Sequence, residues 1–282
     1  MDTILTVLSD VVVLITFPLH CRYLYVMSRA DSKMANLEYA FRASIVNIVV
    51  ANLLYSFVFL LIQEPAAYGQ FTDFYKLNSW WLGKVVIMQS VPLILLTAMI
   101  HFLIAVNRVS ALVDPTGHKK FWSERRVTRT LIAIWAILVL ECVPLAYPFE
   151  GSYYDLISPF HSSGVSLVVK GDLPNIIYQG IAIGIGGMFE VATIILYIYI
   201  GFRVKRLKNL PQSTVTTTIS ALFVSTGGFI IVVVILPDLL AAHLTGQPLW
   251  STEMFYAVFK FANAYNNAVT PWVMLMRYRN VR

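Results

Sequence analysis

The stretch that most constrains this chain is the segment Trp80–Arg129. It opens with the apolar run WWLGKVVIMQSVPLILLTAMIHFLIAVNRV, which is long enough to cross a bilayer, and continues into the charged segment DPTGHKKFWSERRVTR. On a helix that advances about 100° per residue, most polar side chains of this run share one narrow face, which carries Ser90, Thr97, His101 and Arg108. Lipid does not accommodate such a face. We therefore expect this helix to face a protein interior or a watery cleft.

The composition is typical of an integral membrane protein. Of the 282 residues, 58% are hydrophobic and only 13% are charged, and the mean hydropathy is +0.70. The net charge of +6 comes from Lys and Arg residues in short clusters between apolar runs, a pattern that indicates membrane topology and disfavours nucleic-acid binding. The sequence shows no nucleophile paired with a base, no metal-ligand spacing and no phosphate-binding loop. We therefore expect no enzymatic activity, no cofactor and no metal.

Seven apolar runs predict an all-α, seven-transmembrane helix bundle that forms one domain over residues 1–282. We place the spans near residues 4–27, 43–63, 80–107, 130–147, 174–202, 215–240 and 253–276. Lys and Arg residues cluster in one set of loops, which the positive-inside rule places in the cytoplasm. The N-terminus is therefore expected outside and the C-terminus inside. The longest outer loop is predicted over residues 148–173.

The seventh run contains a proline and a lysine that need partners. Pro271 has no backbone N–H, so it weakens the helix one turn earlier, near Asn267, where side-chain amides can satisfy the freed carbonyl. Lys260 lies about three turns outward of Pro271 on nearly the same face of the helix. An ammonium at that depth needs a partner or water. Asp10 in the first run lies at a similar depth, so an Asp10–Lys260 pair is predicted. Two alternatives stay open: Lys260 is a ligand counter-ion, or Asp238 competes for it.

Three polar residues in the other spans each leave a question open. Arg108 either reaches to lipid headgroups or has a functional role at the inner mouth of the bundle. His101 is either packed and hydrogen-bonded to a neighbouring helix or contacts a ligand or a proton. Glu190, about midway down the fifth run, has no structural explanation in the sequence, which leaves a functional role open.

Two segments resemble those of G-protein-coupled receptors. AVNRVSALVDPTGHKKFW places an Asn-Arg pair at the inner end of the third run, followed by a proline and an aromatic residue, and YNNAVTPWVMLMRYRNVR places a proline in the inner half of the seventh run. With the topology, these segments resemble the nematode serpentine chemoreceptors, in particular the group that includes the Srg and Srv classes.

The resemblance implies roles for three residues. Arg108 takes the place of the arginine in the rhodopsin-like Asp-Arg-Tyr motif, and Asn107 takes the place of its acid, so the usual charged lock cannot form. Pro271 takes the place of the proline in the Asn-Pro-x-x-Tyr motif. No cysteine corresponds to the bridge that is common between the third span and the second outer loop of such receptors.

The function implied is that of a chemosensory receptor in the plasma membrane, with a sensory cilium as the location that the resemblance suggests. Such a receptor binds a small external molecule in the outer half of the bundle and signals to a heterotrimeric G protein inside. The polar groups predicted in or under the pocket are Ser90, Thr97, Glu190, Asp238, Tyr256, Lys260 and Asn263. Those predicted at the switch and the G-protein surface are Asn107, Arg108, Arg125, Arg126, Arg203, Lys205, Arg206, Asn267 and Pro271.

Three alternatives stay open. The basic residues of the inner loops also suit anionic lipid. A small secondary transporter is a second function class, although the sequence shows no paired repeats with interrupted helices. A receptor-like protein that no longer signals is the third.

Overall fold

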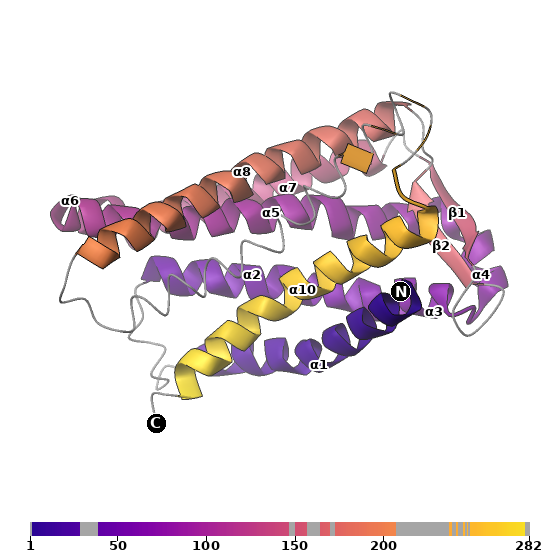
Figure 1. The fold of residues 1–282 in the computed structure, drawn as a ribbon, viewed down its shortest axis with the longest axis horizontal. Coiled ribbons are helices and arrows are strands. Elements are labelled where there is room, and N and C mark those ends of the chain that lie inside the picture. The colour runs from indigo at the N-terminus through magenta and orange to yellow at the C-terminus, as the bar shows by residue number, and fades with distance from the viewer. Residues whose placement is uncertain are drawn as a thin grey trace.

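The structure is a computed structural model that describes residues 2–28, 39–146, 150–156, 164–169, 173–206, 237–238, 241, 245, 247 and 249–279. Within these residues, five helical segments are long and apolar enough to cross a membrane. They are α1 (Asp2–Ser28), α2 (Tyr39–Val58) with its continuation to Ala67, α5 (Ser79–Val113), α7 (Glu124–Ala146) and α8 (Leu173–Arg206). A further long helix, α10 (Thr252–Arg279), covers the seventh predicted run and lies beside α1 (Figure 1). The sixth predicted run, 215–240, lies outside the described residues except at 237–238.

The second helix continues past the end predicted from the sequence. After α2 the chain passes through one π-helical turn, η2 (Phe59–Gln63), and then through the short helix α3 (Glu64–Ala67). The backbone N–H of Glu64 donates to the carbonyl of Phe59, five residues earlier, which is the bond that defines a π-helix. A second short helix, α4 (Thr72–Leu77), follows and leads into α5.

The basic segment after α5 folds into the short helix α6 (Pro115–Phe121). Asp114 caps this helix, because its carboxylate accepts a hydrogen bond of 2.9 Å from the backbone N–H of Gly117. Trp122 follows α6 and donates its indole N–H to the Ser110 hydroxyl over 2.6 Å. These bonds hold α6 against the end of α5, where α7 begins.

The region predicted as an outer loop contains an antiparallel hairpin of β1 (Gly151–Leu156) and β2 (Gly164–Val169). Every second residue of β2 is buried, which is the pattern of a strand with one covered face. The hairpin lies against the start of α5 so closely that a Cβ atom on Gly83 would lie 2.0 Å from the carbonyl oxygen of Val168. Lys76 and Asp155 form an exposed ion pair of 2.6 Å between α4 and this hairpin, and the hydrogen bond to Asp155 raises the pKa of Lys76.

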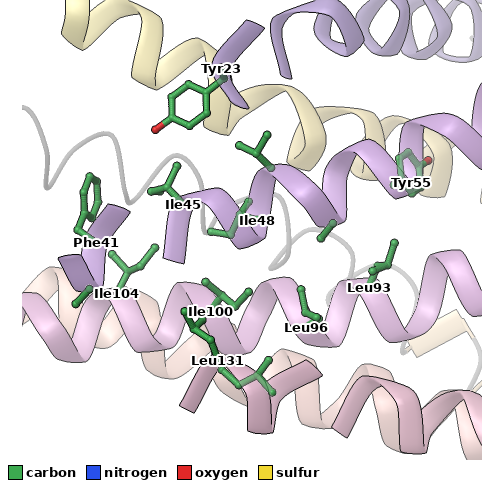
Figure 2. Packing of buried hydrophobic residues seen from close by; sticks show 14 of the residues in the cluster. Tyr23, Phe41, Ile45, Ile48, Tyr55, Leu93, Leu96, Ile100, Ile104 and Leu131 are labelled. Atoms are coloured by element: carbon green, nitrogen blue, oxygen red, sulfur yellow. The ribbon is translucent and has the colours of Figure 1, made fainter. Parts of the chain in front are cut away.

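The largest apolar cluster joins α1, α2, α5, α7 and α10. Figure 2 shows Ile48 of α2 pointing toward Ile100 of α5, with Leu131 of α7 in the same cluster. Large apolar side chains also cover the outer surface of the helices, for example Leu140 of α7 at 67% exposure and Met188 of α8 at 68%. An apolar core beneath an apolar surface is the arrangement expected of helices that are surrounded by lipid.

Candidate functional site: buried polar groups in the helix bundle

Three charged side chains meet inside the bundle, at the end that carries the hairpin. The ammonium of Lys260 on α10 lies 2.6 Å from the Asp10 carboxylate on α1 and 2.9 Å from the Glu64 carboxylate on α3. All three residues are buried, with 3%, 7% and 7% of their surface exposed. The structure thus brings together the Asp10–Lys260 pair predicted from the sequence and adds a second acid to it. We call these three residues the outer charged cluster.

Sequence reasoning missed Glu64, because the second span was predicted to end at residue 63. The π-helical turn η2 precedes Glu64 directly, and such a turn holds one more residue than an α-helical turn, so it changes the direction in which the following side chains point. Phe59, at the start of that turn, places its ring centroid 5.3 Å from the Lys260 ammonium. A signal was present in the sequence: an acidic residue at the outer end of the second run, at the depth of Lys260.

The outer charged cluster contains two carboxylates and one ammonium. With all three groups ionised, it has one excess negative charge in an apolar environment, where charge is costly. The Tyr68 hydroxyl donates a hydrogen bond to Asp10 and so stabilises part of this charge. Burial, helped by that hydrogen bond, raises the pKa of Tyr68, which keeps the hydroxyl protonated as a donor.

A second polar network centres on Asn267 of α10. Its side-chain oxygen lies 2.6 Å from His20 Nε2 on α1, and its amide donates to the Ser56 hydroxyl on α2 over 2.8 Å. Asn52 of α2 donates its side-chain amide to the Asn267 carbonyl over 3.4 Å, and the Asn267 amide donates to the Asn52 carbonyl over 3.3 Å. That carbonyl is the one that Pro271 leaves without a helical donor, and a side-chain amide satisfies it as the sequence predicted.

A third polar contact joins α5 to α8. His101 Nδ1 lies 3.0 Å from the carboxylate of Glu190, and both residues are almost fully buried, at 4% and 2% exposure. Sequence reasoning singled out both residues but did not pair them. Within the described residues, His101 Nε2 and the second oxygen of Glu190 have no hydrogen-bond partner. The pair provides a structural explanation for Glu190 that the sequence lacked.

The predicted inward face of α5 is buried. Ser90 and Thr97 are each 4% exposed, and their hydroxyls bond to backbone carbonyls of the same helix, at Ile87 and Leu93. Their polarity is therefore satisfied within α5, and a neighbouring helix is not needed for it.

Arg108 lies at the opposite end of α5 from the outer charged cluster. Its guanidinium carbon lies 4.5 Å from the centroid of the Phe41 ring on α2, and it interacts electrostatically with Tyr197 on α8. Asn107 beside it is buried. Arg108 is half-buried between α2 and α8, so its side chain faces the bundle.

Two further predicted pocket residues have local partners. Asn263 is buried and donates its amide to the Phe259 carbonyl of its own helix over 2.9 Å. Asp238 accepts a hydrogen bond of 2.9 Å from the backbone N–H of Trp250, so its carboxylate has a partner just before the start of α10.

The residues predicted to form the G-protein surface lie on several helices. Arg125 is exposed on α7, and Arg126 on α7 places its guanidinium carbon 5.8 Å from the Phe121 ring centroid. Arg203 on α8 donates to the Tyr199 hydroxyl over 3.0 Å. The remaining predicted residues lie in α8 or α10, but their side chains fall outside the described part of the chain: Lys205, Arg206, Tyr256 and Pro271.

The comparison with known families agrees with this arrangement. Residues 21–158, just under half of the chain, match the family model described as Serpentine type 7TM GPCR chemoreceptor Srx. Over these residues the chain is similar to a family of seven-transmembrane chemoreceptors, and its long apolar helices are those of a multi-pass membrane protein. No curated protein matches the chain.

The match corrects the finer family prediction. The sequence motifs pointed to the group with the Srg and Srv classes, whereas the matching model is that of Srx, a different subfamily of the same superfamily. Both quoted motifs are short segments at the ends of long helices. Motifs of that kind identify the superfamily and do not separate its subfamilies.

Proposed function

We propose that this chain is a chemosensory receptor that binds a small external molecule in the outer half of its helix bundle and signals to a heterotrimeric G protein. The observation that carries the proposal is the presence of charged groups inside the bundle at both ends, with the buried outer charged cluster at one end and the half-buried Arg108 at the other. Ionisable groups inside a membrane bundle are costly to maintain and usually mark a functional site. The family match over residues 21–158 supports the same function.

The proposed orientation places the N-terminus and the hairpin outside, and α6 and the C-terminus inside. The hairpin and the start of α1 lie at one end of the molecule, and α6 and the end of α10 lie at the other (Figure 1). The positive-inside rule supports this assignment, because α6 and the first turn of α7 carry Lys119, Lys120, Arg125 and Arg126.

The outer charged cluster is the proposed point at which a ligand acts on the bundle. Lys260 connects α10 to α1 and α3 through two acids, so a ligand group that replaces one of these partners alters the packing of α10. A ligand shifts a conformational equilibrium only by its differential affinity for the two states. An ion-pair exchange inside a low-dielectric bundle supplies such a difference, because each contact there is stronger than in water.

Arg108 is the proposed contact with the G protein. In the rhodopsin-like motif an acid precedes the arginine, but Asn107 stands there in this chain. The contact with the Phe41 ring replaces that charged partner. A cation–π contact contributes about 0.5–2 kcal/mol, so this contact by itself does not prevent the arginine from reaching an incoming helix.

The experiment is a G-protein activation assay in cells that express the receptor, with a panel of small volatile and water-soluble molecules as stimuli. Arg108→Ala is expected to abolish the response of surface-expressed receptor. Arg22→Ala is the matched control, because Arg22 is an exposed arginine in the last two turns of α1. An unchanged response of Arg108→Ala at equal surface expression would falsify the coupling role. A C-terminal epitope tag that antibodies reach on intact cells would overturn the orientation.

A further inference from the structure

A groove is lined by residues of α5, α6 and α7. These three helices meet at the end of the molecule opposite the hairpin (Figure 1). Its volume is about 440 Å³, within the range of about 300–1,000 Å³ that small-molecule pockets occupy. The floor is apolar and includes Leu103 and Val106 of α5 and Val127 of α7. Arg126 and Arg129 of α7 line the same groove and are exposed. The groove therefore combines an apolar floor with a cationic rim.

The two arginines are placed to act on one group. They are three residues apart on α7, so they lie on the same side of the helix, one turn from each other. Arg126 also donates to the Lys120 carbonyl over 3.4 Å and lies near the Phe121 ring, contacts that hold its guanidinium beside the mouth of the groove. Two guanidinium groups around one position suit a phosphate oxyanion.

The groove lies at the charged end of a helix that is long and apolar enough to cross a membrane. Val127 and Thr130 lie within the apolar segment Glu124–Pro144, whereas the chain just before that segment carries Lys119 and Lys120. An apolar floor at the depth of the acyl chains contacts lipid, and a soluble protein does not reach it. A free phosphate ion would bind the rim but leave the floor uncovered.

We propose that this groove binds one anionic phospholipid of the cytoplasmic leaflet. Its phosphate contacts Arg126 and Arg129, and an acyl chain lies along Leu103, Val106 and Val127. The cytoplasmic leaflet is the one that is rich in anionic lipid, and basic residues beside the membrane attract it. The choice of leaflet rests on the orientation proposed above, whereas the binding itself does not.

The test is native mass spectrometry of the purified full-length chain in detergent with equal amounts of phosphatidylglycerol and phosphatidylcholine. We expect one phosphatidylglycerol molecule to be retained in preference to phosphatidylcholine. The double variant Arg126→Ala/Arg129→Ala is expected to lower that retention about thirtyfold, from about 1 kcal/mol for each arginine. The matched control is Lys119→Ala/Arg125→Ala, which removes the same charge from exposed positions that do not line the groove. It is expected to retain the lipid.

The floor is tested separately from the charge. Leu103→Trp fills the groove while both arginines remain, so retention of phosphatidylglycerol is expected to fall. If the tryptophan variant does not fold, Val106→Phe is a smaller change in the same floor. A folded variant has the thermal unfolding midpoint of the parent in phosphatidylcholine.

Several results overturn the proposal. Equal losses in the two double variants mean that attraction is diffuse, and full retention in folded floor variants means that no acyl chain lies there. If inorganic phosphate displaces the lipid at low concentration, the rim alone is an anion site. If a dimer forms and disappears with the groove variants while no lipid is retained, the occupant is a second copy of the chain. None of these results bears on G-protein coupling, because the readout involves neither signalling nor a ligand.

Discussion

Removal of the Lys260 ammonium is the perturbation with the largest predicted effect on this bundle. Lys260→Met keeps most of the side-chain volume but leaves the carboxylates of Asp10 and Glu64 buried without their shared cation. At an effective dielectric constant of about 20, unit charges at these separations attract by about 6 kcal/mol for each contact. Desolvation offsets most of that attraction. The net loss for removal of one partner from a buried pair is about 3–5 kcal/mol.

The excess of acid over base in the outer charged cluster predicts an asymmetry. Glu64→Gln removes one carboxylate and leaves the Asp10–Lys260 pair balanced, and the new amide oxygen can still accept a hydrogen bond from the ammonium. We therefore expect Glu64→Gln to change the free energy of unfolding by about 1 kcal/mol or less. The lysine variant is expected to be several times more destabilising than the acid variant, although both alter the contact between Lys260 and Glu64.

The assay is thermal unfolding of the purified receptor in lipid nanodiscs. At about 2–4 °C for each kcal/mol in a chain of this size class, Lys260→Met should lower the unfolding midpoint by roughly 10 °C and Glu64→Gln by only a few degrees. Lys76→Met is the matched control, because it makes the same substitution in the exposed ion pair with Asp155 and should stay close to the parent. If Glu64→Gln costs as much as Lys260→Met, or if Lys260→Met behaves like Lys76→Met, the reasoning from charge balance is refuted.

Three further predictions are measured by unfolding, by surface expression and by amide exchange. Asn267→Ala leaves its buried partners on α1 and α2 unsatisfied and should cost about 2–4 kcal/mol, whereas Asn263→Ala, whose amide bonds only within α10, should cost about 1 kcal/mol or less. Gly83→Ala places a Cβ atom against the hairpin backbone and should sharply reduce surface expression, whereas Gly180→Ala meets no atom of the described residues within 4 Å and should express normally. Because its carboxylate partner raises the pKa of Lys76, the stabilisation of the hairpin by this ion pair should be fully present below pH 10.5 and disappear as the pH rises through the higher folded-state pKa. Amide exchange in the hairpin measures that loss, and an equal pH response in Lys76→Met would contradict it.

The sequence predicted well those features that follow from local chemistry. The polar face of α5 is buried because helical periodicity alone puts Ser90, Thr97 and His101 on one side. The carbonyl freed by Pro271 is satisfied by a side-chain amide because a proline always creates that need. Both predictions require knowledge of a single helix only.

The sequence predicted poorly which residues lie opposite each other. Asn52 had no distinguishing signal, because a lone amide in an apolar helix has many possible partners. His101 and Glu190 were each singled out as unexplained, yet their pairing depends on how α5 and α8 are rotated against each other. Glu64 depends on a π-helical turn, which no periodicity rule anticipates. The site residues that the sequence did not predict are therefore those whose partners depend on how the helices pack against each other.

The hydrogen-bond lengths also distinguish how α10 is held by its two neighbours. Contacts from α10 to α1 are short, at 2.6 Å for Lys260 to Asp10 and 2.6 Å for Asn267 to His20. On α2, the Asn267 amide donates to Ser56 over 2.8 Å, whereas the reciprocal amide bonds with Asn52 are 3.3 and 3.4 Å, which is the weak end of hydrogen-bond geometry. Since α2 also carries the Phe41 ring that contacts Arg108, the boundary between α10 and α2 lies between the two proposed sites. Under the proposed function, a ligand that displaces Lys260 from Asp10 and Glu64 leaves α10 joined to α1 and α2 through the hydrogen bonds of Asn267.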